Sequence, residues 1–530
     1  MALKQHVSLL MMPFHTKHVQ QRMMEPTEQS IWQPCQISFD KGKLYPHIAQ
    51  FLKPDNNEGN IYHYQYYSLS PDAEDIRKML KTPMAIEAKD SVGERRHIYF
   101  SLGEAEESKE ERFFSPKLVI CPSAGVGMLI FSVHLDNVSG APDNFTINNL
   151  IDLNYAIFKT YSLDSSQTQH ITLRSQAEII RSQQELDSLP TEGAEKERTK
   201  IEGKLKGMCA KLPEKLQAID RALGRTPAAS TAEAHWTMTE LVERLMSEFT
   251  DQYERFDLYR LHVFTYLQVD EGDLSPDLFD DFVRIIKLQN SNYLTIDTQE
   301  SHSIYERSFQ NVYLGCTVEG GAIMTLASAP SLAATQTSNF IRDFMRSSLS
   351  QSYVWTYMMI QIQRYTLLFL EQQLTQHSYL QNSTVERNTL RDLIGRTTQN
   401  KLSSYFIDIS DHTQHNQFYS MCCRNLHVKE YSKSIEQKLE MLTDYLKMLT
   451  EQSNEEESKR LANSSRVITV ICAVFALFSS TYDAYQLFGE VGIFNSHTPL
   501  LLRTIIVLGS IAIIAYLLRV ALRMYIKRKK

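Results

Sequence analysis

The chain lacks the short motifs that mark the common enzyme classes. It contains no P-loop, no HExxH zinc motif and no GxSxG nucleophile motif. The stretch Ala124–Gly127 reads AGVG, but it separates two predicted strands, whereas a dinucleotide-binding loop opens a helix. We therefore predict that the protein is not an enzyme.

Signals for disulfides and structural metal are also missing. The seven cysteines show no CxxC spacing, and a reducing compartment would keep them as thiols. His412 and His415 would lie one helical turn apart, but they have no obvious third ligand. We predict neither disulfides nor structural zinc, and we assign no metal to the two histidines.

The main part of the chain has little basic charge and no secretory signal. The full sequence has 55 Lys and Arg against 62 Asp and Glu, a net charge of −7. Seven of the basic residues follow residue 466, beside only Asp483 and Glu490, so the preceding residues are distinctly acidic. An acidic field disfavours the backbone of nucleic acids, and we predict no direct nucleic-acid partner. Because no secretory signal begins the chain, we expect the bulk of it in the cytoplasm.

Apolar residues are concentrated in two segments near the C-terminus, Val467–Phe488 and Leu500–Leu518. Each approaches the roughly 20 residues that a helix needs to cross about 30 Å of hydrocarbon, and the short loop between them would make the two helices antiparallel. Basic residues flank the pair, whereas Gly489–Pro499 holds no Lys or Arg. The sequence therefore predicts a multi-pass protein with a transmembrane hairpin in a lipid bilayer and with both termini cytoplasmic.

Ahead of these segments, strand-like and helix-like patterns alternate and predict a mixed α/β fold. Apolar runs such as Arg96–Leu102 and Met128–Leu135 are typical of strands, and Ile147–Tyr161 is typical of a helix. The same order recurs after a linker near residue 230. The predicted parts are an N-terminal α/β subdomain at 1–165, a helical insertion at 166–226, a second α/β subdomain at 235–337, long helices and a stalk at 338–465, and two transmembrane helices with a basic tail at 466–530.

Polar residues interrupt the long apolar stretch Val354–Leu374. They are Gln361, Gln363 and Arg364, and their presence favours a helix buried in the protein core over a third membrane span.

A single very long helix is predicted from about Asn416 to Gly489, because no glycine or proline interrupts this stretch. Its apolar residues first repeat at alternating spacings of four and three residues, the pattern that buries one helix against others. This seam comprises Ile435, Leu439, Leu442, Leu446 and Leu449.

Small and polar side chains form one stripe of the first apolar segment. An ionisable side chain within a span costs about 2.5 to 3.5 kcal/mol against lipid, so Asp483 is expected to face a bundle interior or water. Repeated around a symmetric ring, the stripe would line a pore. Alternatively, the small residues only let helices approach closely, and Asp483 reaches interfacial water or pairs with Arg503. The predicted pore-lining residues are Thr469, Cys472, Ala476, Ser479, Asp483, Gln486 and Glu490.

Residues 338–530, with their long helices, stalk, two apolar segments and basic tail, resemble the CorA divalent-cation transporter superfamily. In that family five stalk helices form a funnel and five copies of the first span line the pore. The resemblance therefore implies a homo-oligomer, a pentamer of this chain, in the bacterial inner membrane, with Mg²⁺ as the transported ion. The tail residues that correspond to the family's basic ring are Lys527, Arg528, Lys529 and Lys530.

The chain departs from that family at the outer end of the first span, where CorA proteins carry Gly-Met-Asn and this chain reads YQLFGEVGIFNSHTP. The enlarged N-terminal region is similar to that of the divergent CorA-type effectors encoded beside type III CRISPR systems. That resemblance implies control by a nucleotide second messenger, the conjugate of S-adenosylmethionine with AMP (SAM-AMP), and an antiviral role through membrane permeabilisation.

Three functions follow, in this order. The first is a homo-oligomeric ion channel gated by a nucleotide-type ligand such as SAM-AMP. The second is a CorA-type transporter of magnesium or another divalent cation, against which the missing tripeptide counts. The third is a membrane-anchored scaffold. The predicted fold class is an α/β cytoplasmic domain followed by stalk helices and a C-terminal transmembrane hairpin, as in CorA.

Overall fold

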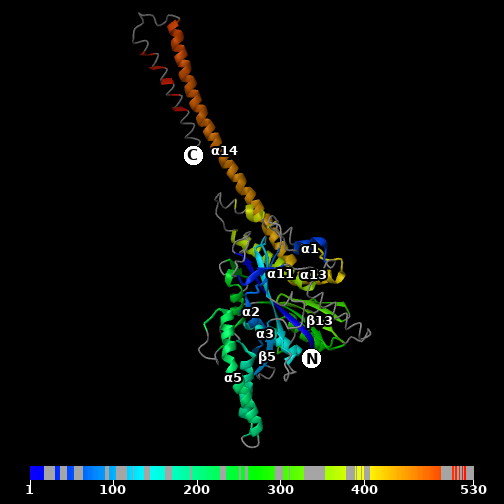
Figure 1. Ribbon diagram of the computed structural model, residues 1–530. Helices are drawn as coiled ribbons and strands as arrows, with labels where there is room; N and C mark the ends of the chain where they lie inside the picture. Colours follow the sequence, from blue (N-terminus) through cyan, green and yellow to red (C-terminus); the bar gives the residue numbers. More distant parts are fainter. Residues whose placement is uncertain are drawn as a thin grey trace. The chain divides into compact units, whose positions relative to one another are not determined.

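A sheet of 13 strands organises the larger part of the chain in the computed structural model (Figure 1). Its main path runs in the order β11-β12-β13-β10-β1-β7-β5-β4-β8, and β2, β3, β6 and β9 pair beside this path. The strands are β1 (Leu3–Thr16), β2 (Trp32–Pro34), β3 (Gln65–Leu69), β4 (Met84–Lys89), β5 (Arg95–Ser101), β6 (Lys117–Cys121), β7 (Val126–Leu135), β8 (Ile171–Leu173), β9 (Tyr253–Arg255), β10 (His262–Val269), β11 (Tyr305–Phe309), β12 (Val312–Cys316) and β13 (Gly320–Leu326).

The structure describes most of the chain, in segments. These are residues 1–16, 30–35, 44–52, 64–89, 95–102, 116–122, 124–136, 144–160, 170–190, 194–226, 234–249, 252–256, 261–292, 303–309, 311–327, 352–377, 388, 391–395, 397–398 and 406–490, with scattered positions between 504 and 520. The main helices of these segments are α2 (Glu74–Lys81), α3 (Ile147–Thr160), α4 (Arg174–Ser188), α5 (Glu195–Leu223), α6 (Met238–Leu245), α7 (Pro276–Ile286), α11 (Val354–His377), α13 (Thr413–Asn425) and α14 (Val428–Glu490).

Contacts divide the chain into two units. The first comprises Met1–Tyr379 and Asp392–Leu439, and the second comprises Leu380–Arg391 and Glu440–Lys530. The sheet therefore belongs to the first unit, whereas most of α14 belongs to the second.

The longest strand, β1, joins the two regions that the sequence analysis describes as separate α/β subdomains. It pairs antiparallel with β7 on one side, where Leu9 faces Ser132, and with β10 on the other, where Leu9 faces Phe264. Strand β10 in turn pairs parallel with β13. Because parallel neighbours need a crossover connection, the chain between them passes through α7, β11 and β12. Strands from residues 1–165 and from residues 235–337 thus share one sheet.

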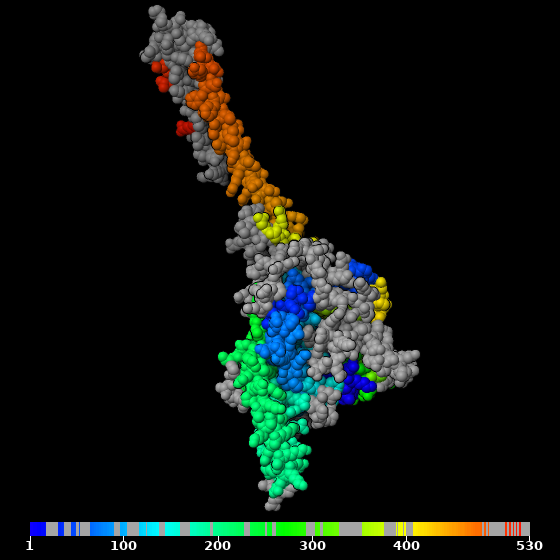
Figure 2. All heavy atoms as spheres, in the orientation of Figure 1, coloured from blue at the N-terminus to red at the C-terminus, as the bar shows by residue number. Residues whose placement is uncertain are grey.

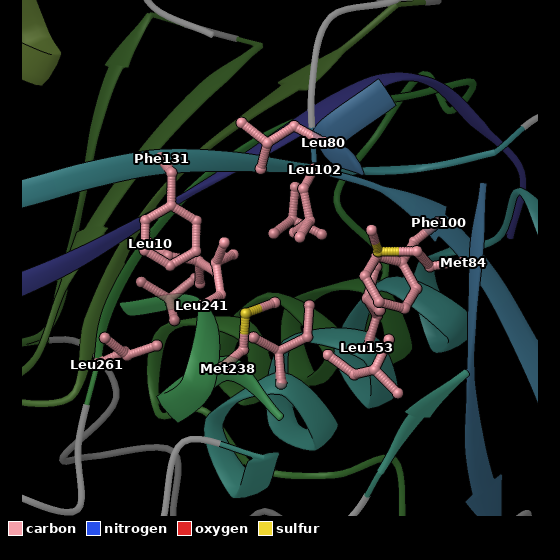
Figure 3. Close-up of a cluster of buried hydrophobic side chains, with 14 of the residues drawn as sticks. Leu10, Leu80, Met84, Phe100, Leu102, Phe131, Leu153, Met238, Leu241 and Leu261 are labelled. Atoms are coloured by element: carbon pink, nitrogen blue, oxygen red, sulfur yellow. The ribbon is translucent and has the colours of Figure 1, made fainter. Parts of the chain in front are cut away.

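The hydrophobic core lies where the sheet meets α3 and α6. In Figure 3, Leu153 of α3 and Leu241 of α6 point toward side chains of the strands, among them Leu10 and Phe131. All four side chains are fully buried, and burying such a side chain contributes roughly 1.5 to 3 kcal/mol. The apolar runs that predict the strands therefore also supply this core, and central strands such as β7 and β10 are buried along almost their whole length.

The helical insertion predicted at 166–226 contains α4 and α5, which pack against each other. Helix α5 ends at Gly224, whose φ of +71° is the left-handed conformation that glycine adopts most readily. Helix α5 packs against α2, and Figure 2 shows the surface of α5 in green beside the blue surface of the N-terminal residues.

The long C-terminal helix is interrupted once. The sequence predicts one helix from about Asn416, but α13 ends at Asn425 and α14 begins at Val428. His427 between them has a φ of +55°, a left-handed conformation that a continuous α-helix does not contain.

The prediction of a transmembrane hairpin is wrong. Among the described residues we find no helix whose length and apolar character would suffice to span a bilayer. Val467–Phe488 forms the last part of α14, and its apolar run is broken after Phe478 by a polar stretch that ends in Asp483. Most of Leu500–Leu518 lies outside the described residues. The fold class is therefore mixed α/β with long helices, and the assignments to a lipid bilayer, to the bacterial inner membrane and to a membrane channel are corrected with it.

Candidate functional site

A polar pocket lies where β5, α3 and α7 approach one another. Its volume is about 330 Å³, at the lower end of the range typical of ligand clefts. Helix packing explains its position, because α3 packs directly on α7. The pocket is lined by Arg96, Asn148, Asp277, Asp280, Asp281, Arg284 and Ser291.

One wall of the pocket is held by Asp152 of α3. This carboxylate is only 4% exposed and forms an ion pair with the guanidinium of Arg96. Its Oδ1 accepts a hydrogen bond from the backbone N–H of Ser291 at 2.9 Å, and its Oδ2 accepts one from the Ser291 hydroxyl at 3.0 Å. Asp152 thereby fixes both Arg96 and the turn that follows α7.

The opposite wall is the face of α7 that carries Asp280, Asp281 and Arg284. The helix starts at Pro276, and the Ser275 hydroxyl caps it by accepting a hydrogen bond from the N–H of Leu278 at 3.2 Å. Arg284 Nη1 donates to Asp281 Oδ1 at 2.7 Å. Burial raises the pKa of Asp281, an effect that the Arg284 charge opposes and the neighbouring Asp280 carboxylate reinforces.

The charges of the pocket do not balance. Asp152 is neutralised by Arg96 and Asp281 by Arg284, whereas Asp277 and Asp280 have no ion pair in the part of the chain that the structure describes. The Nε of Arg96 is buried and has no hydrogen-bond partner. The site therefore offers surplus carboxylates for a positive group, beside the partly exposed guanidinium of Arg96, which suits an acceptor.

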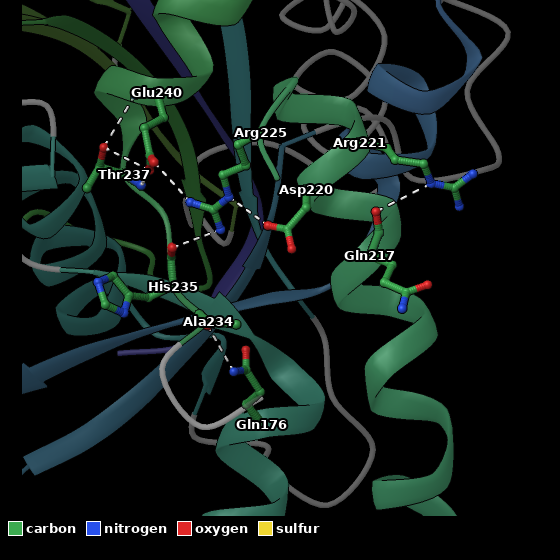
Figure 4. A network of polar contacts seen from close by, with 9 residues as sticks. All are labelled: Gln176, Gln217, Asp220, Arg221, Arg225, Ala234, His235, Thr237 and Glu240. Carbon is green, nitrogen blue, oxygen red and sulfur yellow. Dashed lines mark hydrogen bonds and ion pairs between the residues drawn. The ribbon is translucent and has the colours of Figure 1, made fainter. Parts of the chain in front are cut away.

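A second polar cluster, around Arg225, is structural (Figure 4). Its guanidinium donates to Asp220 at 2.6 Å, to Glu240 at 2.9 Å and to the carbonyl of His235 at 3.0 Å. Glu240 also accepts from the N–H of Thr237 at 2.7 Å, as in a capping box. Because the guanidinium binds three partners, this cluster joins the end of α5 to the start of α6.

The predicted pore-lining stripe lies on α14. The side chains of Thr469, Cys472, Ala476, Ser479, Asp483 and Gln486 are all exposed there. The side chain of Glu490, and all of Arg503, lie outside the described residues, as does the basic tail. The proposed Asp483–Arg503 pair and the tail residues therefore remain predictions.

The two histidines set aside in the sequence lie at the start of α13. His415 is buried, and its ring centroid is 5.6 Å from that of His412. In the described ranges, no group of three or more His, Cys, Asp or Glu side chains is arranged to hold a metal ion.

Sequence reasoning missed every residue of the pocket. Asp152 is one acidic residue in an otherwise apolar helix pattern, and the pocket's acidic residues on α7 stand close together in the run SPDLFDD. The second feature is a visible signal, but acidic residues are common in the first turns of helices because they favour the helix dipole. The sequence offers no means of bringing these segments to Arg96.

Comparison with known proteins found no match for this chain among protein-family models, among curated proteins or among solved structures.

Proposed function

We propose that the protein is a ligand-responsive effector that binds a small molecule carrying both a positive and a negative group in the pocket between β5, α3 and α7. The observation that carries the proposal is the pairing of surplus carboxylates with the partly exposed guanidinium of Arg96 in one concave site. Clefts with a few convergent polar groups are the usual form of small-molecule sites.

The ligand class that we propose is a nucleotide-type conjugate such as SAM-AMP. Its methionine-derived part carries cationic groups, which Asp277 and Asp280 would attract, and its phosphate is an acceptor for a guanidinium. The volume of about 330 Å³ suits one part of such a conjugate, with the remainder extending from the opening. The resemblance to effectors of type III CRISPR systems supports an antiviral setting for this response.

Binding of SAM-AMP to the purified protein should depend on Asp280. The Asp280→Asn variant removes one charge and keeps the side-chain shape, so its Kd should rise about tenfold or more, as expected for losing a contact between a carboxylate and a cation. Isothermal titration calorimetry would measure this, with AMP and S-adenosylmethionine alone as comparison ligands. The control is Asp187→Asn, an equal change at an exposed position of α4, which should leave the Kd unchanged. Failure of the wild-type protein to bind, or unaltered binding by Asp280→Asn, would contradict the proposal.

A scaffold that assembles through α14 is a second candidate, and a specific pattern favours it. Five apolar residues recur at spacings of 3, 4, 3 and 4, which is the heptad repeat of a coiled coil, and all are 48 to 70% exposed in the single chain. Identical copies of the helix are the partner that such a repeat fits. The residues are Ile468, Ile471, Phe475, Phe478 and Tyr482.

Self-association through this repeat should be lost on placing a charge within it. Phe475→Asp is expected to convert an oligomer into a monomer, because a buried unpaired carboxylate is strongly unfavourable in a coiled-coil seam. Light scattering after size-exclusion chromatography measures the mass. Ala473→Asp places the same charge on the other side of α14 and should leave the mass unchanged. A monomeric wild-type protein would eliminate this candidate and leave the ligand proposal untouched.

A further inference from the structure

Helix α11 is buried on nearly all sides, although it carries several polar residues. From Tyr353 to Leu367 every described side chain is buried, on every face of the helix. This confirms the sequence-based prediction of a core helix for the stretch that Gln361, Gln363 and Arg364 interrupt. A helix buried all round is expected to be apolar all round, so these three polar residues need an explanation.

Arg364 is the most unusual of them, because it is 9% exposed and forms no ion pair within the described residues. Its Nε and Nη1 atoms are buried and lack hydrogen-bond partners. The one ring stacked near it is that of its chain neighbour Tyr365, whose centroid lies 5.6 Å from the guanidinium carbon. Among the described residues, the positive charge therefore has no carboxylate that compensates it.

Other buried or half-buried arginines of the same unit each form an ion pair with a carboxylate. The Arg255 side chain is also 9% exposed, and it pairs with Glu243 at 3.3 Å. Arg284 and Arg225 are less buried, and they pair with Asp281 and Asp220 at 2.7 Å and 2.6 Å. Of these four arginines, Arg364 is the one that has no carboxylate partner among the described residues.

An uncompensated guanidinium is costly in a protein interior. Transfer of an isolated charge out of water is strongly unfavourable, and lysine or histidine can relieve the cost by losing a proton. Arginine cannot, because its guanidinium does not lose a proton in proteins. Only 9% of the side chain reaches water, so an anion from outside the chain would offset most of the cost.

The groups beside Arg364 fit such an anion. Tyr357 lies two helical turns earlier on the same face of α11, and its hydroxyl oxygen accepts a hydrogen bond from Gln361 Nε2 at 2.9 Å, which leaves its own O–H to donate. Gln361 lies one turn after Tyr357 and one turn before Arg364, so the three polar side chains follow one another along this face. Burial raises the pKa of Tyr357 well above its ordinary value, and the Arg364 charge opposes this effect. The Oε1 of Gln361 has no hydrogen-bond partner and is an acceptor for a protonated oxygen.

We propose that Arg364 and Tyr357 form an oxyanion-binding site inside the first unit, which takes a phosphate ion or the phosphoryl group of a larger ligand. A guanidinium binds the oxygens of phosphate through a planar fork of N–H groups, and hydrogen bonds between charged groups are roughly twice as strong as neutral ones. The site is separate from the pocket at Asp280, and it does not depend on the proposed ligand of that pocket.

The test is the thermal stability of the full chain in potassium phosphate against potassium chloride of equal ionic strength. A ligand that binds only the folded state raises the Tm with its concentration, and we expect a rise of about 2 °C or more at saturating phosphate. Phosphate is also excluded from protein surfaces and stabilises folded proteins in general. The Arg364→Met variant keeps the side-chain length without the charge, so its phosphate-dependent rise should be smaller than that of the wild type by about 2 °C or more. The control Arg221→Met removes an equal charge from an exposed position of α5 and should respond as the wild type does.

In chloride alone, the direction of the Tm change in Arg364→Met distinguishes an anion-binding role of Arg364 from a structural role in an internal ion pair. Removing an unpaired buried cation should leave the Tm of Arg364→Met equal to or above that of the wild type, whereas removing one half of an internal ion pair lowers it. An absent phosphate response in the wild type, or an undiminished one in Arg364→Met, overturns the proposal. Should Arg364→Met not fold, Arg364→Lys keeps the charge without the fork. A weaker phosphate response in that variant then supports the site, and an equal response overturns it.

Discussion

Lowering the pH from 7 to 5 is expected to destabilise the protein by on the order of 4 kcal/mol through His6 and His134, since one pKa unit corresponds to about 1.4 kcal/mol. Burial and, to a smaller extent, the neighbouring His134 lower the pKa of His6 to about 3. Burial lowers the pKa of His134 to about 4. The two rings lie 6.2 Å apart, on β1 and β7.

Stability decreases as the pH falls because the folded state requires the neutral form of His6. His6 Nε2 accepts a hydrogen bond from the N–H of Leu135 at 2.8 Å, which only an unprotonated nitrogen can do. Well above pH 6.5 both histidines are neutral in the folded and unfolded chain, so they do not affect the pH dependence there. Below pH 6.5 the unfolded chain binds protons that the folded chain does not, and stability falls until the folded pKa values of about 4 and 3 are reached. His134 is partly exposed, so His6 contributes the larger share.

Urea unfolding at pH 7 and pH 5 measures this difference. The His6→Gln variant keeps an acceptor for the Leu135 N–H but cannot take up a proton, and it should lose about half or more of the difference between the two pH values. His47→Gln changes an exposed histidine and should behave as the wild type. An equal loss of stability in wild type and His6→Gln would show that other groups cause the acid sensitivity.

The secondary structure could be predicted where local periodicity decides it. The strand predicted at Met128–Leu135 is part of β7, and the helix predicted at Ile147–Tyr161 is α3, Ile147–Thr160. Gly125, predicted as a turn residue, has a φ of +67° between β6 and β7. These elements depend on residues within one short window, which is the information that a sequence pattern contains.

The transmembrane hairpin was predicted wrongly and the pocket was not predicted at all, because both depend on more than the residues of one short segment. The apolar run at Val467–Phe478 has a composition typical of a span, but the polar stretch that follows limits its length. Conversely, Arg96, Asp152 and Ser291 stand far apart in the sequence and meet only through the packing of α3 on α7 and the pairing of β5 in the sheet. No periodicity within one segment contains that information.

Replacing Asp152 should destabilise the protein by about 3 kcal/mol, the lower end of the range for breaking a buried ion pair by removing one partner. The Asp152→Asn variant places an amide where the carboxylate accepts hydrogen bonds from Arg96 and from both the N–H and the hydroxyl of Ser291. The lower end applies because the side chain of Arg96 is 36% exposed, so water solvates it once its partner is lost. Urea unfolding measures the free energy of each variant.

A double-mutant cycle shows how much of this loss belongs to the ion pair. Arg96→Met removes the other partner and leaves Asp152 with the two donors of Ser291, so its cost should be smaller than that of Asp152→Asn. If the two charges interact directly, the double variant should be less destabilised than the sum of the single variants by about 1 to 3 kcal/mol. Additive losses would mean that Asp152 acts through Ser291 and not through Arg96. In that case the pocket wall at Arg96 would be held by the sheet alone, and Asp152→Asn would leave the guanidinium in place for a ligand.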